Sequence, residues 1–303
     1  MRTKIFYLLS NQEYKDYLTN FMSWLKVLGY SGTTIKNYPR CLEEFFFQLE
    51  KRNITTIEKI NQKVMDDYSS YIQTRPKQTD GGALSISQIN RHFAVLEKFK
   101  EYLAQKENKH LIYKTSYLKK DRRPEVDFLE EEEIKALYKA TDETPHGYRD
   151  RAILSIFYGC GLRRNEGAEL DIDHILTERK LVLVTQPKNN YERHVPIAGK
   201  HLCYITQYIE TARPFFLPLG SKEKALLISE RGNRIVKEQI YNRVKRLGEL
   251  AGIHKAVGVH MLRHSIATHL ARKGMELENI ALFLGHLSLD STQIYTHIVN
   301  EKE

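Results

Sequence analysis

Residues 260–295, HMLRHSIATHLARKGMELENIALFLGHLSLDSTQIY, form the stretch that the rest of the chain serves. His260, Arg263 and His264 are spaced i, i+3 and i+4, which predicts that one helical turn places all three on the same face. The apolar residues at positions 266, 267, 270 and 271 give this helix a stripe that would pack against a core. Because that stripe is buried, the polar face would be held still.

A glycine-histidine pair and a tyrosine follow the helix. His286 comes directly after Gly285, and Tyr295 lies nine positions after His286. Each residue alone has an ordinary interpretation: Tyr295 is one of 18 tyrosines, and two histidines at i and i+4 can bind zinc, although the glutamate of HExxH is missing. An arginine between those histidines disfavours a cation and favours a phosphate. Together and in this order, the residues predict a site that binds a phosphate and attacks it.

The ordered set of HMLRH, LGH and a tyrosine nine residues later resembles the C-terminal signature of the tyrosine recombinases, the phage integrase and Xer-type family. Members of that family carry a G-L-R-x-x-E element upstream, and this chain has GLRRNE at residues 161–166. Alone, GLRRNE would favour a surface Arg–Glu pair. The resemblance implies that Arg163 is the first catalytic arginine and that Glu166 supports it, whereas Arg164 is expected to face solvent. The resemblance is strong over residues 158–297 and loose in the N-terminal half.

A β-hairpin is expected between residues 181 and 197. LVLV and RHVPI have strand character, and QPKNNYE between them predicts a turn. In the family this hairpin carries a lysine that reaches the minor groove and protonates the leaving oxygen, and Lys188 matches it by its position before R-x-V-P. Pro187 and Asn189 replace the usual Gly-Lys-Gly surroundings, and a flexible hairpin lysine is the alternative interpretation.

The composition is that of a soluble globular chain with excess positive charge. The 303 residues are 41% hydrophobic and 28% charged. The chain contains no run of about 18 apolar residues, so no membrane span is expected. The net charge is +9, of which residues 1–121 carry +7. This imbalance suits a polyanion gripped mainly by the N-terminal part, although a solvated basic surface explains the charge equally well. Three distant cysteines (Cys41, Cys160, Cys203) predict reduced thiols in a cytoplasmic protein.

Two domains are expected, and the fold class is mainly α with a small β-sheet. Residues 1–108 show apolar periodicity for four helices, at about 11–28, from 31 onward, 62–74 and 85–105. They resemble the SAM-like helical core-binding domain of the family, which covers one face of the DNA. Residues 109–121 form a basic linker, and residues 122–303 form the tyrosine-recombinase catalytic domain. Candidate phosphate contacts in the first domain, each of which is also an ordinary exposed side chain, are Tyr30, Thr33, Thr34, Lys36, Asn37, Arg91 and His92.

Further helices and one more strand are expected in the catalytic domain. The helices are at about residues 129–140, 149–158, 202–212 and 237–251 and from 258 onward, and the strand is at 225–229. Three basic residues of the 237–251 helix face either phosphates or water: Arg243, Lys245 and Arg246.

The resemblance implies a transesterification of a DNA phosphodiester. Tyr295 would attack the scissile phosphorus, leaving a 3′-phosphotyrosyl enzyme and a free 5′-hydroxyl, and the covalent bond would conserve energy for resealing. A phenol with a pKa of about 10 is a weak nucleophile at neutral pH and needs help. Arg163 and Arg263 would bind the non-bridging oxygens and offset the charge of the transition state.

Proton transfer would fall to other residues. His260 is the candidate general base toward the tyrosine, and Lys188 is the candidate acid. His286 would donate a hydrogen bond to the phosphate, and His264 would order the site from behind. Two arginines replace the metal ions of many phosphoryl-transfer sites, so no cofactor and no metal are expected.

The expected partners are double-stranded DNA and other protomers in a synaptic tetramer, without a membrane. Whether a second recombinase or an accessory DNA-bending protein takes part stays open. The biological role, whether chromosome dimer resolution, mobile-element integration or inversion, also stays open. Eight residues follow Tyr295, and we expect this tail to contact a neighbouring protomer weakly. Two rivals are a type IB topoisomerase-like enzyme, which nicks without strand exchange, and a DNA-binding regulator that does not cut. The regulator would lack a catalytic residue, and none is missing.

Overall fold

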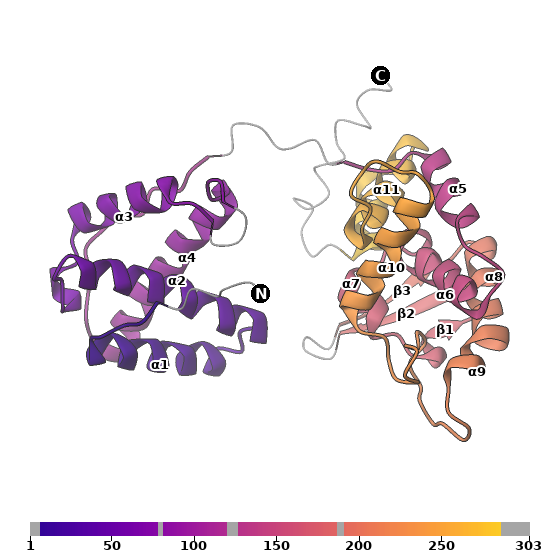
Figure 1. Ribbon diagram of the computed structural model, residues 1–303, viewed down its shortest axis with the longest axis horizontal. Coiled ribbons are helices and arrows are strands. Elements are labelled where there is room, and N and C mark those ends of the chain that lie inside the picture. Colours follow the sequence, from indigo (N-terminus) through magenta and orange to yellow (C-terminus); the bar gives the residue numbers. More distant parts are fainter. Residues whose placement is uncertain (1–6, 78–80, 120–126, 187–190, 286–303) are drawn as a thin grey trace. The chain divides into compact units, whose positions relative to one another are not determined.

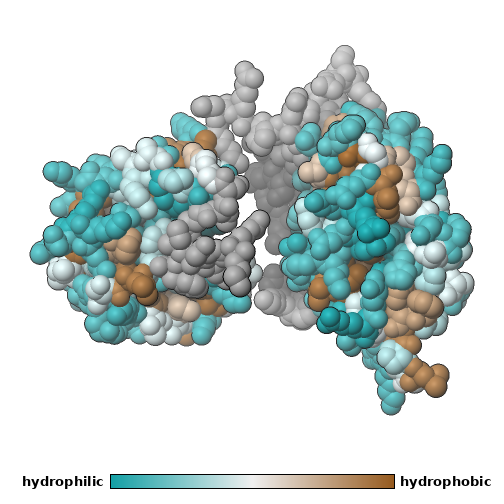
Figure 2. Space-filling model, in the orientation of Figure 1, coloured by the Kyte–Doolittle hydropathy of each residue, from teal (hydrophilic) through white to brown (hydrophobic). Residues whose placement is uncertain are grey.

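The computed structural model describes residues 7–77, 81–119, 127–186 and 191–285, and the chain forms two compact units, Met1–Arg123 and Pro124–Glu303. Figure 1 shows an N-terminal unit made of helices and a C-terminal unit of helices around a small sheet. The expected fold class is confirmed. Among the described residues, no helix is both long and apolar enough to cross a membrane. Figure 2 shows a mainly hydrophilic surface on the visible face of each unit.

The N-terminal unit contains the four expected helices, and capping side chains fix where they begin. They are α1 (Gln12–Val27), α2 (Gly32–Lys51), α3 (Gln62–Thr74) and α4 (Ile86–Tyr102), with a short 3-10 helix, η1 (Ile57–Lys59). Each N-cap side chain accepts a hydrogen bond from a backbone amide of the first turn. Ser85 and Gln88 also form a reciprocal capping box at the start of α4.

Aromatic rings fill the core between these helices. Phe21, Phe46 and Phe99 are almost completely buried, and the last two meet edge to face with ring centroids 5.5 Å apart. After α4 comes a π-helical turn, η2 (Leu103–Glu107), and the chain then returns along the same unit. The Tyr113 hydroxyl donates to the Leu96 carbonyl at 2.9 Å, and the Leu118 amide donates to the Asn90 side chain at 2.9 Å. Residues 109–118, part of the expected linker, therefore pack on the N-terminal unit.

The C-terminal unit surrounds a three-stranded antiparallel sheet of order β1-β2-β3. The strands are β1 (Ile175–Leu176), β2 (Leu181–Gln186) and β3 (Tyr191–Pro196). The α-helices are α5 (Glu131–Lys139), α6 (Pro145–Leu154), α7 (Arg164–Ala168), α8 (Gly199–Gln207), α9 (Arg213–Phe216), α10 (Lys237–Leu250), α11 (Val259–Arg272) and α12 (Leu277–Leu284). A 3-10 helix, η4 (Ile172–His174), and two π-helical turns, η3 (Ser155–Gly159) and η5 (Tyr208–Ala212), complete the described elements.

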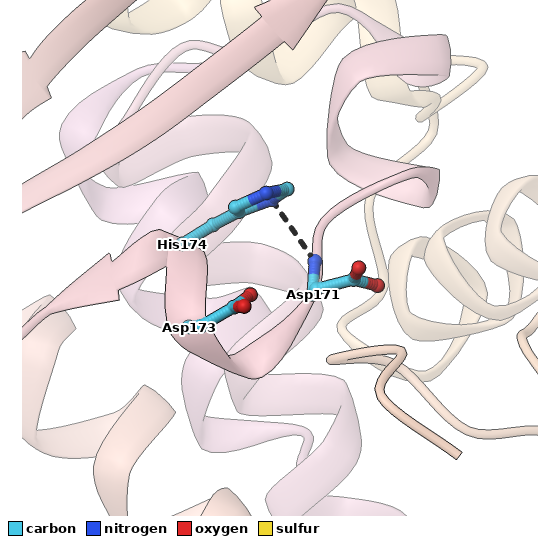
Figure 3. Close-up of side chains that lie close together, drawn as sticks. All are labelled: Asp171, Asp173 and His174. Carbon is cyan, nitrogen blue, oxygen red and sulfur yellow. Dashed lines mark hydrogen bonds between the residues drawn. The ribbon is translucent and has the colours of Figure 1, made fainter.

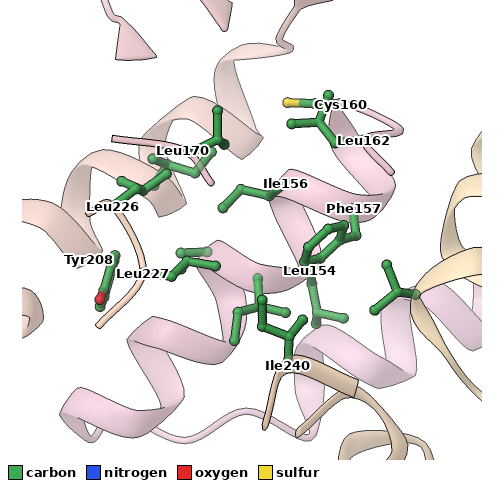
Figure 4. Close-up of a cluster of buried hydrophobic side chains, with 14 of the residues drawn as sticks. Leu154, Ile156, Phe157, Cys160, Leu162, Leu170, Tyr208, Leu226, Leu227 and Ile240 are labelled. Carbon is green, nitrogen blue, oxygen red and sulfur yellow. The ribbon is translucent and has the colours of Figure 1, made fainter. Parts of the chain in front are cut away.

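Apolar side chains from the helices and from residues 225–228 form the main core of this unit. Figure 4 shows Leu154, Ile156 and Phe157 converging with Leu227 and Ile240. Each of these side chains is at most 1% exposed. Burying apolar surface stabilises a fold by about 25 cal/mol per Å². This core therefore holds in place the elements that carry the polar site.

Three details of the C-terminal unit differ from expectation. Residues 225–229 do not form a strand but make isolated bridges, Asp171↔Ala225 and Ile228↔Arg234. The helix expected at 149–158 begins earlier, at Pro145, because Thr144 caps it by accepting from the Gly147 amide. Strand β1 was not expected, since two residues are too few to show an alternating pattern.

Candidate active site

The first predicted arginine sits where a tight turn meets α12. Gly161 has a φ of +58°, and a Cβ there would lie 2.9 Å from the Phe283 ring, so the turn approaches α12 closely. Arg163 then takes the N-cap position of α7. Its backbone amide donates to Glu166 Oε2 at 2.8 Å, and its Nη1 donates to Glu166 Oε1 at 2.9 Å. The second terminal nitrogen, Nη2, donates to the Gly285 carbonyl at 2.7 Å.

The second predicted arginine, Arg263, reaches the same place from α11. Its side chain is buried, with Nη1 donating to the Gly161 carbonyl at 2.6 Å and Nη2 donating to the Leu284 carbonyl at 2.8 Å. Nη1 also lies 4.0 Å from Glu166 Oε2. The two arginines are 100 positions apart in the sequence, and the last carbonyls of α12 bring them together. Those carbonyls carry the negative end of the helix dipole, which favours guanidinium groups.

Glu166 joins these arginines to a third, Arg193 of β3, which sequence reasoning missed. Arg193 donates from Nη1 to Glu166 Oε1 and from Nη2 to Oε2, both at 2.9 Å, and also from Nη2 to the Leu284 carbonyl at 3.3 Å. Glu166 is 6% exposed and Arg193 is 8% exposed. Burial alone would raise the pKa of Glu166, but the hydrogen bonds from Arg193 and Arg163 outweigh it and lower this pKa to about 2.

Among the described residues, the charges of this group do not balance. Three guanidinium groups surround one carboxylate, which leaves an excess of two positive charges in a largely buried cluster. Part of that excess is stabilised by the carbonyl oxygens of Gly161, Leu284 and Gly285. A cluster of this kind is suited to a dianionic group such as the transition state of phosphoryl transfer.

The two predicted histidines lie on α11 beside Arg263. Desolvation by neighbouring groups, and then the positive charges of Arg164 and Arg263, lower the pKa of His260. Burial, and then His260 and Arg263, lower the pKa of His264. Lower pKa values favour neutral rings, and a neutral imidazole is the form that accepts a proton. Arg164 is partly exposed, and its positive charge reaches His260.

Three predicted residues lie outside the described residues: Lys188, His286 and Tyr295. For Lys188 and His286, described residues lie close by in the sequence. Gly285 ends α12 as its C-cap with a φ of +68°, directly before His286. Strand β3, which carries Arg193, begins at Tyr191, three positions after Lys188.

Two other candidates for DNA contact turn inward. Arg243 of α10 donates from Nε to Asp150 Oδ1 at 3.0 Å and from Nη2 to Asp150 Oδ2, and Asp150 is 2% exposed. His92 of α4 is 6% exposed, and its Nδ1 lies 2.9 Å from the Tyr68 hydroxyl. Both side chains therefore hold helices together, whereas Lys245 and Arg246 of α10 are exposed.

One group of potential metal ligands lies at the turn before β1. Figure 3 shows Asp171, Asp173 and His174, whose ligand atoms lie within 4.8 Å of one another. The His174 Nδ1 accepts from the Asp171 amide at 3.1 Å, and the Asp171 carboxylate pairs with Arg234. These contacts cap η4 and tie it to residue 234, which gives the cluster a structural role.

Comparisons with known proteins agree with the geometry. The sequence model of the phage integrase family matches residues 127–302. The tyrosine recombinase XerD of Staphylococcus epidermidis strain RP62A is 34% identical over 287 residues, covering 94% of this chain and 93% of that protein. Tyrosine recombinase XerC 2 of Ralstonia nicotianae is 31% identical, covering 93% of this chain and 81% of that protein.

Solved structures share the fold at lower identity. The XerH site-specific recombinase bound to its difH substrate in a pre-cleavage complex has a TM-score of 0.71 and 21% identity, covering 97% of this chain and 88% of that one. The Tn1549 transposon integrase in complex with a circular intermediate DNA has a TM-score of 0.70 and 16% identity, covering 92% of this chain and 94% of that one.

Proposed function

This chain belongs to the phage integrase family and is a tyrosine-type site-specific recombinase, and we propose that it cleaves and rejoins double-stranded DNA through a 3′-phosphotyrosyl intermediate. The observation that carries the mechanism is the convergence of Arg163 and Arg263 on Glu166 and the last carbonyls of α12. Two arginines from distant elements, held in one place with excess positive charge, supply what a pentavalent phosphate requires.

In the proposed reaction, the Tyr295 oxygen forms a bond to the scissile phosphorus while the bond to the 5′-oxygen breaks. Arg163 and Arg263 bind the two non-bridging oxygens, and His286 adds a hydrogen bond to the same phosphate. His260 accepts the phenol proton, a role favoured by its lowered pKa, and Lys188 donates a proton to the leaving 5′-oxygen.

Behind these residues, two others hold the geometry. Glu166 receives hydrogen bonds from Arg163 and stays ionised, so it fixes that arginine's orientation. His264 lies one helical turn after His260 on α11 and helps to position His260 without contacting the phosphate itself. The reverse reaction, attack of a 5′-hydroxyl on the phosphotyrosine, uses the same groups and reseals the strand.

The division of labour between the domains is part of the proposal. Residues 1–108 clamp one face of the DNA, residues 109–121 link the domains, and residues 122–303 carry out catalysis. The two compact units and the basic charge of residues 1–121 support this arrangement. Strand exchange takes place in the cytoplasm between protomers paired on two duplexes in a tetramer. A lambda integrase tetramer bound to a Holliday junction shares this fold, with a TM-score of 0.64.

The test is a trapping assay on nicked suicide DNA made from sequence flanking the gene. We expect the wild type to form an SDS-resistant protein–DNA adduct that Tyr295→Phe cannot form. An adduct that persists in Tyr295→Phe would mean that another residue is the nucleophile. DNA binding without an adduct on any substrate would favour the non-cutting regulator, and relaxation of supercoiled DNA that needs no specific site would favour a type IB topoisomerase-like enzyme.

A further inference from the structure

We infer that Arg193 is a positioning residue of this active site, which holds Glu166 and the end of α12 in one arrangement and thereby keeps Arg163 turned toward the phosphate. The inference rests on the proposed function, because only a phosphate-attacking site gives this arrangement a catalytic consequence. It assigns a role to a buried arginine that the mechanism above does not use.

The position of Arg193 in the sheet explains why it points inward. On β3, Arg193 and Val195 are buried, whereas Glu192 and His194 between and beside them are exposed. Arg193 faces Val184 in the register of the hairpin, so its side chain leaves the sheet on the same side as the core valines. A charged side chain at a core-facing position is costly unless it is fully paired.

The charge of Arg193 is paired through its two terminal nitrogens, which connect three elements, whereas its buried Nε has no hydrogen-bond partner among the described residues. Its two terminal nitrogens each donate to a different oxygen of Glu166 at 2.9 Å, which joins β3 to α7. Nη2 also donates to the Leu284 carbonyl at 3.3 Å, which joins both to α12. A Cβ on Gly285 would lie only 2.6 Å from the Arg193 guanidinium, so this group also packs against the end of α12.

These three elements each lead directly to a proposed catalytic residue. Arg163 caps α7, Lys188 precedes β3 by three positions, and His286 follows Gly285. Among the described side chains of β3, Arg193 is therefore the one that donates hydrogen bonds to both Glu166 and α12. A shift in its position would be transmitted to Arg163 through Glu166, whose Oε1 accepts from both arginines.

The sharing of Glu166 gives Arg193 its specific effect on Arg163. Oε1 of Glu166 accepts from Nη1 of both Arg163 and Arg193, each at 2.9 Å. Without Arg193, the buried carboxylate would draw Arg163 into a two-pronged pair, and Arg163 would turn its donors away from the phosphate. Lysine cannot replace Arg193, because an ammonium group cannot contact both carboxylate oxygens in the planar geometry of a guanidinium.

The experiment compares Arg193→Lys with Arg213→Lys in the full-length chain. Arg213 is a matched control, because it is 7% exposed and also fixes the fold by donating to backbone carbonyls, those of Ala225 and Glu223, away from Glu166. For each variant we would measure the melting temperature, the affinity for DNA and the single-turnover rate of adduct formation on the nicked substrate. The rates are compared at a temperature where both variants are folded.

We expect Arg193→Lys to slow cleavage about 100-fold, the size of effect that a misplaced catalytic group produces, without a matching loss of DNA affinity. Arg213→Lys should lose stability but keep its cleavage rate. Equal cleavage rates in the two variants would overturn the inference while leaving the proposed function intact. Absence of an adduct with the wild type would instead refute the proposed function. If Arg193→Lys does not fold, Arg193→Gln serves, because its amide retains hydrogen bonds without the charge.

Discussion

The guanidinium of Arg163 donates a hydrogen bond of 2.7 Å to the backbone carbonyl of Gly285, 122 positions further along the chain. This contact ties the turn that presents the first arginine to the residue directly before His286. Gly285 can serve as this connection because its φ of +68° ends α12 in a left-handed conformation, which exposes the carbonyl to Arg163. The site therefore depends on a glycine that carries no chemistry of its own.

Gly285→Ala tests that dependence, with Gly274→Ala as the matched control. Both glycines have positive φ, and each change costs about 1 kcal/mol in backbone strain. A Cβ at Gly274 meets nothing within 4 Å, whereas one at Gly285 would lie 2.6 Å from the Arg193 guanidinium. An arginine tip can usually swing away, but this one would have to give up its bonds to Glu166.

We therefore expect Gly285→Ala to lower the melting temperature more than Gly274→Ala and to slow adduct formation, while Gly274→Ala cleaves at the wild-type rate. Thermal melts and single-turnover cleavage measure the two effects. Equal stability and equal rates in both variants would show that the contact between Gly285 and Arg193 is loose in solution.

Glu166→Gln should remove a pH-dependent contribution to stability. The pKa of Glu166 is about 2 in the folded protein against 4.5 for an ordinary glutamate, and a lowered pKa stabilises the fold at pH above the unfolded value. The contribution, about 3 kcal/mol, is complete above pH 4.5 and disappears as the pH falls toward 2. At neutral pH the glutamine variant should be less stable by about 3 kcal/mol or more, because buried arginines lose their partner.

Melting temperatures of the wild type and Glu166→Gln, measured from pH 7 to pH 2, check this. The gap between the two proteins should be widest above pH 5 and narrow steadily below it. Glu178→Gln, a change at an exposed position of the same unit, is the control and should follow the wild type throughout. A gap that stays constant with pH would mean that Glu166 is not held ionised by its arginines.

The sequence predicted the residues that carry chemistry better than the residues that hold them. Arg163, Glu166 and Arg263 stand in motifs with fixed spacing, and the structure brings them together. The sequence places Arg193 only in a predicted strand, RHVPI. Its signal was the alternation of that strand, since a residue two before a buried valine also faces inward, but its partner Glu166 is 27 positions away and no local pattern links them.

Arg243 shows the same limit in a residue that was predicted to contact DNA but pairs within the protein. Helical periodicity placed it among basic residues suited to phosphates, yet it pairs with Asp150, which lies 93 positions earlier in the sequence. Pairing across such a distance is decided by how α6 and α10 pack, which the periodicity of either helix alone does not contain. The early start of α6 at Pro145, in contrast, was readable from the Thr-Pro pair that begins it.

Arg243→Ala and Arg246→Ala should show that one basic residue of α10 contributes to stability and the other to DNA affinity. Removing Arg243 leaves Asp150 buried without its hydrogen-bond partner, which costs about 3 kcal/mol and leaves the salt dependence of DNA affinity unchanged. Arg246 is exposed, so its removal should change stability by less than about 0.5 kcal/mol and reduce the slope of log affinity against log salt by about 1. Denaturant melts and binding titrations at several salt concentrations measure both, and a reduced salt slope for Arg243→Ala would contradict the structural assignment.

Arg164→Gln should shift the titration of His260. After desolvation, the charge of Arg164 is the next largest cause that lowers the pKa of His260, followed by that of Arg263. Removing the Arg164 charge should therefore raise this pKa, so that His260 becomes protonated at a higher pH than in the wild type. Since a protonated imidazole cannot accept the tyrosine proton, the acid limb of the pH–rate profile for adduct formation should move to higher pH by the same amount.

NMR titration of the His260 ring in the DNA-free protein measures the pKa directly. The control is Arg246→Gln, which removes one exposed positive charge from α10. If the His260 titration moves but the acid limb of the rate does not, then another residue acts as the base.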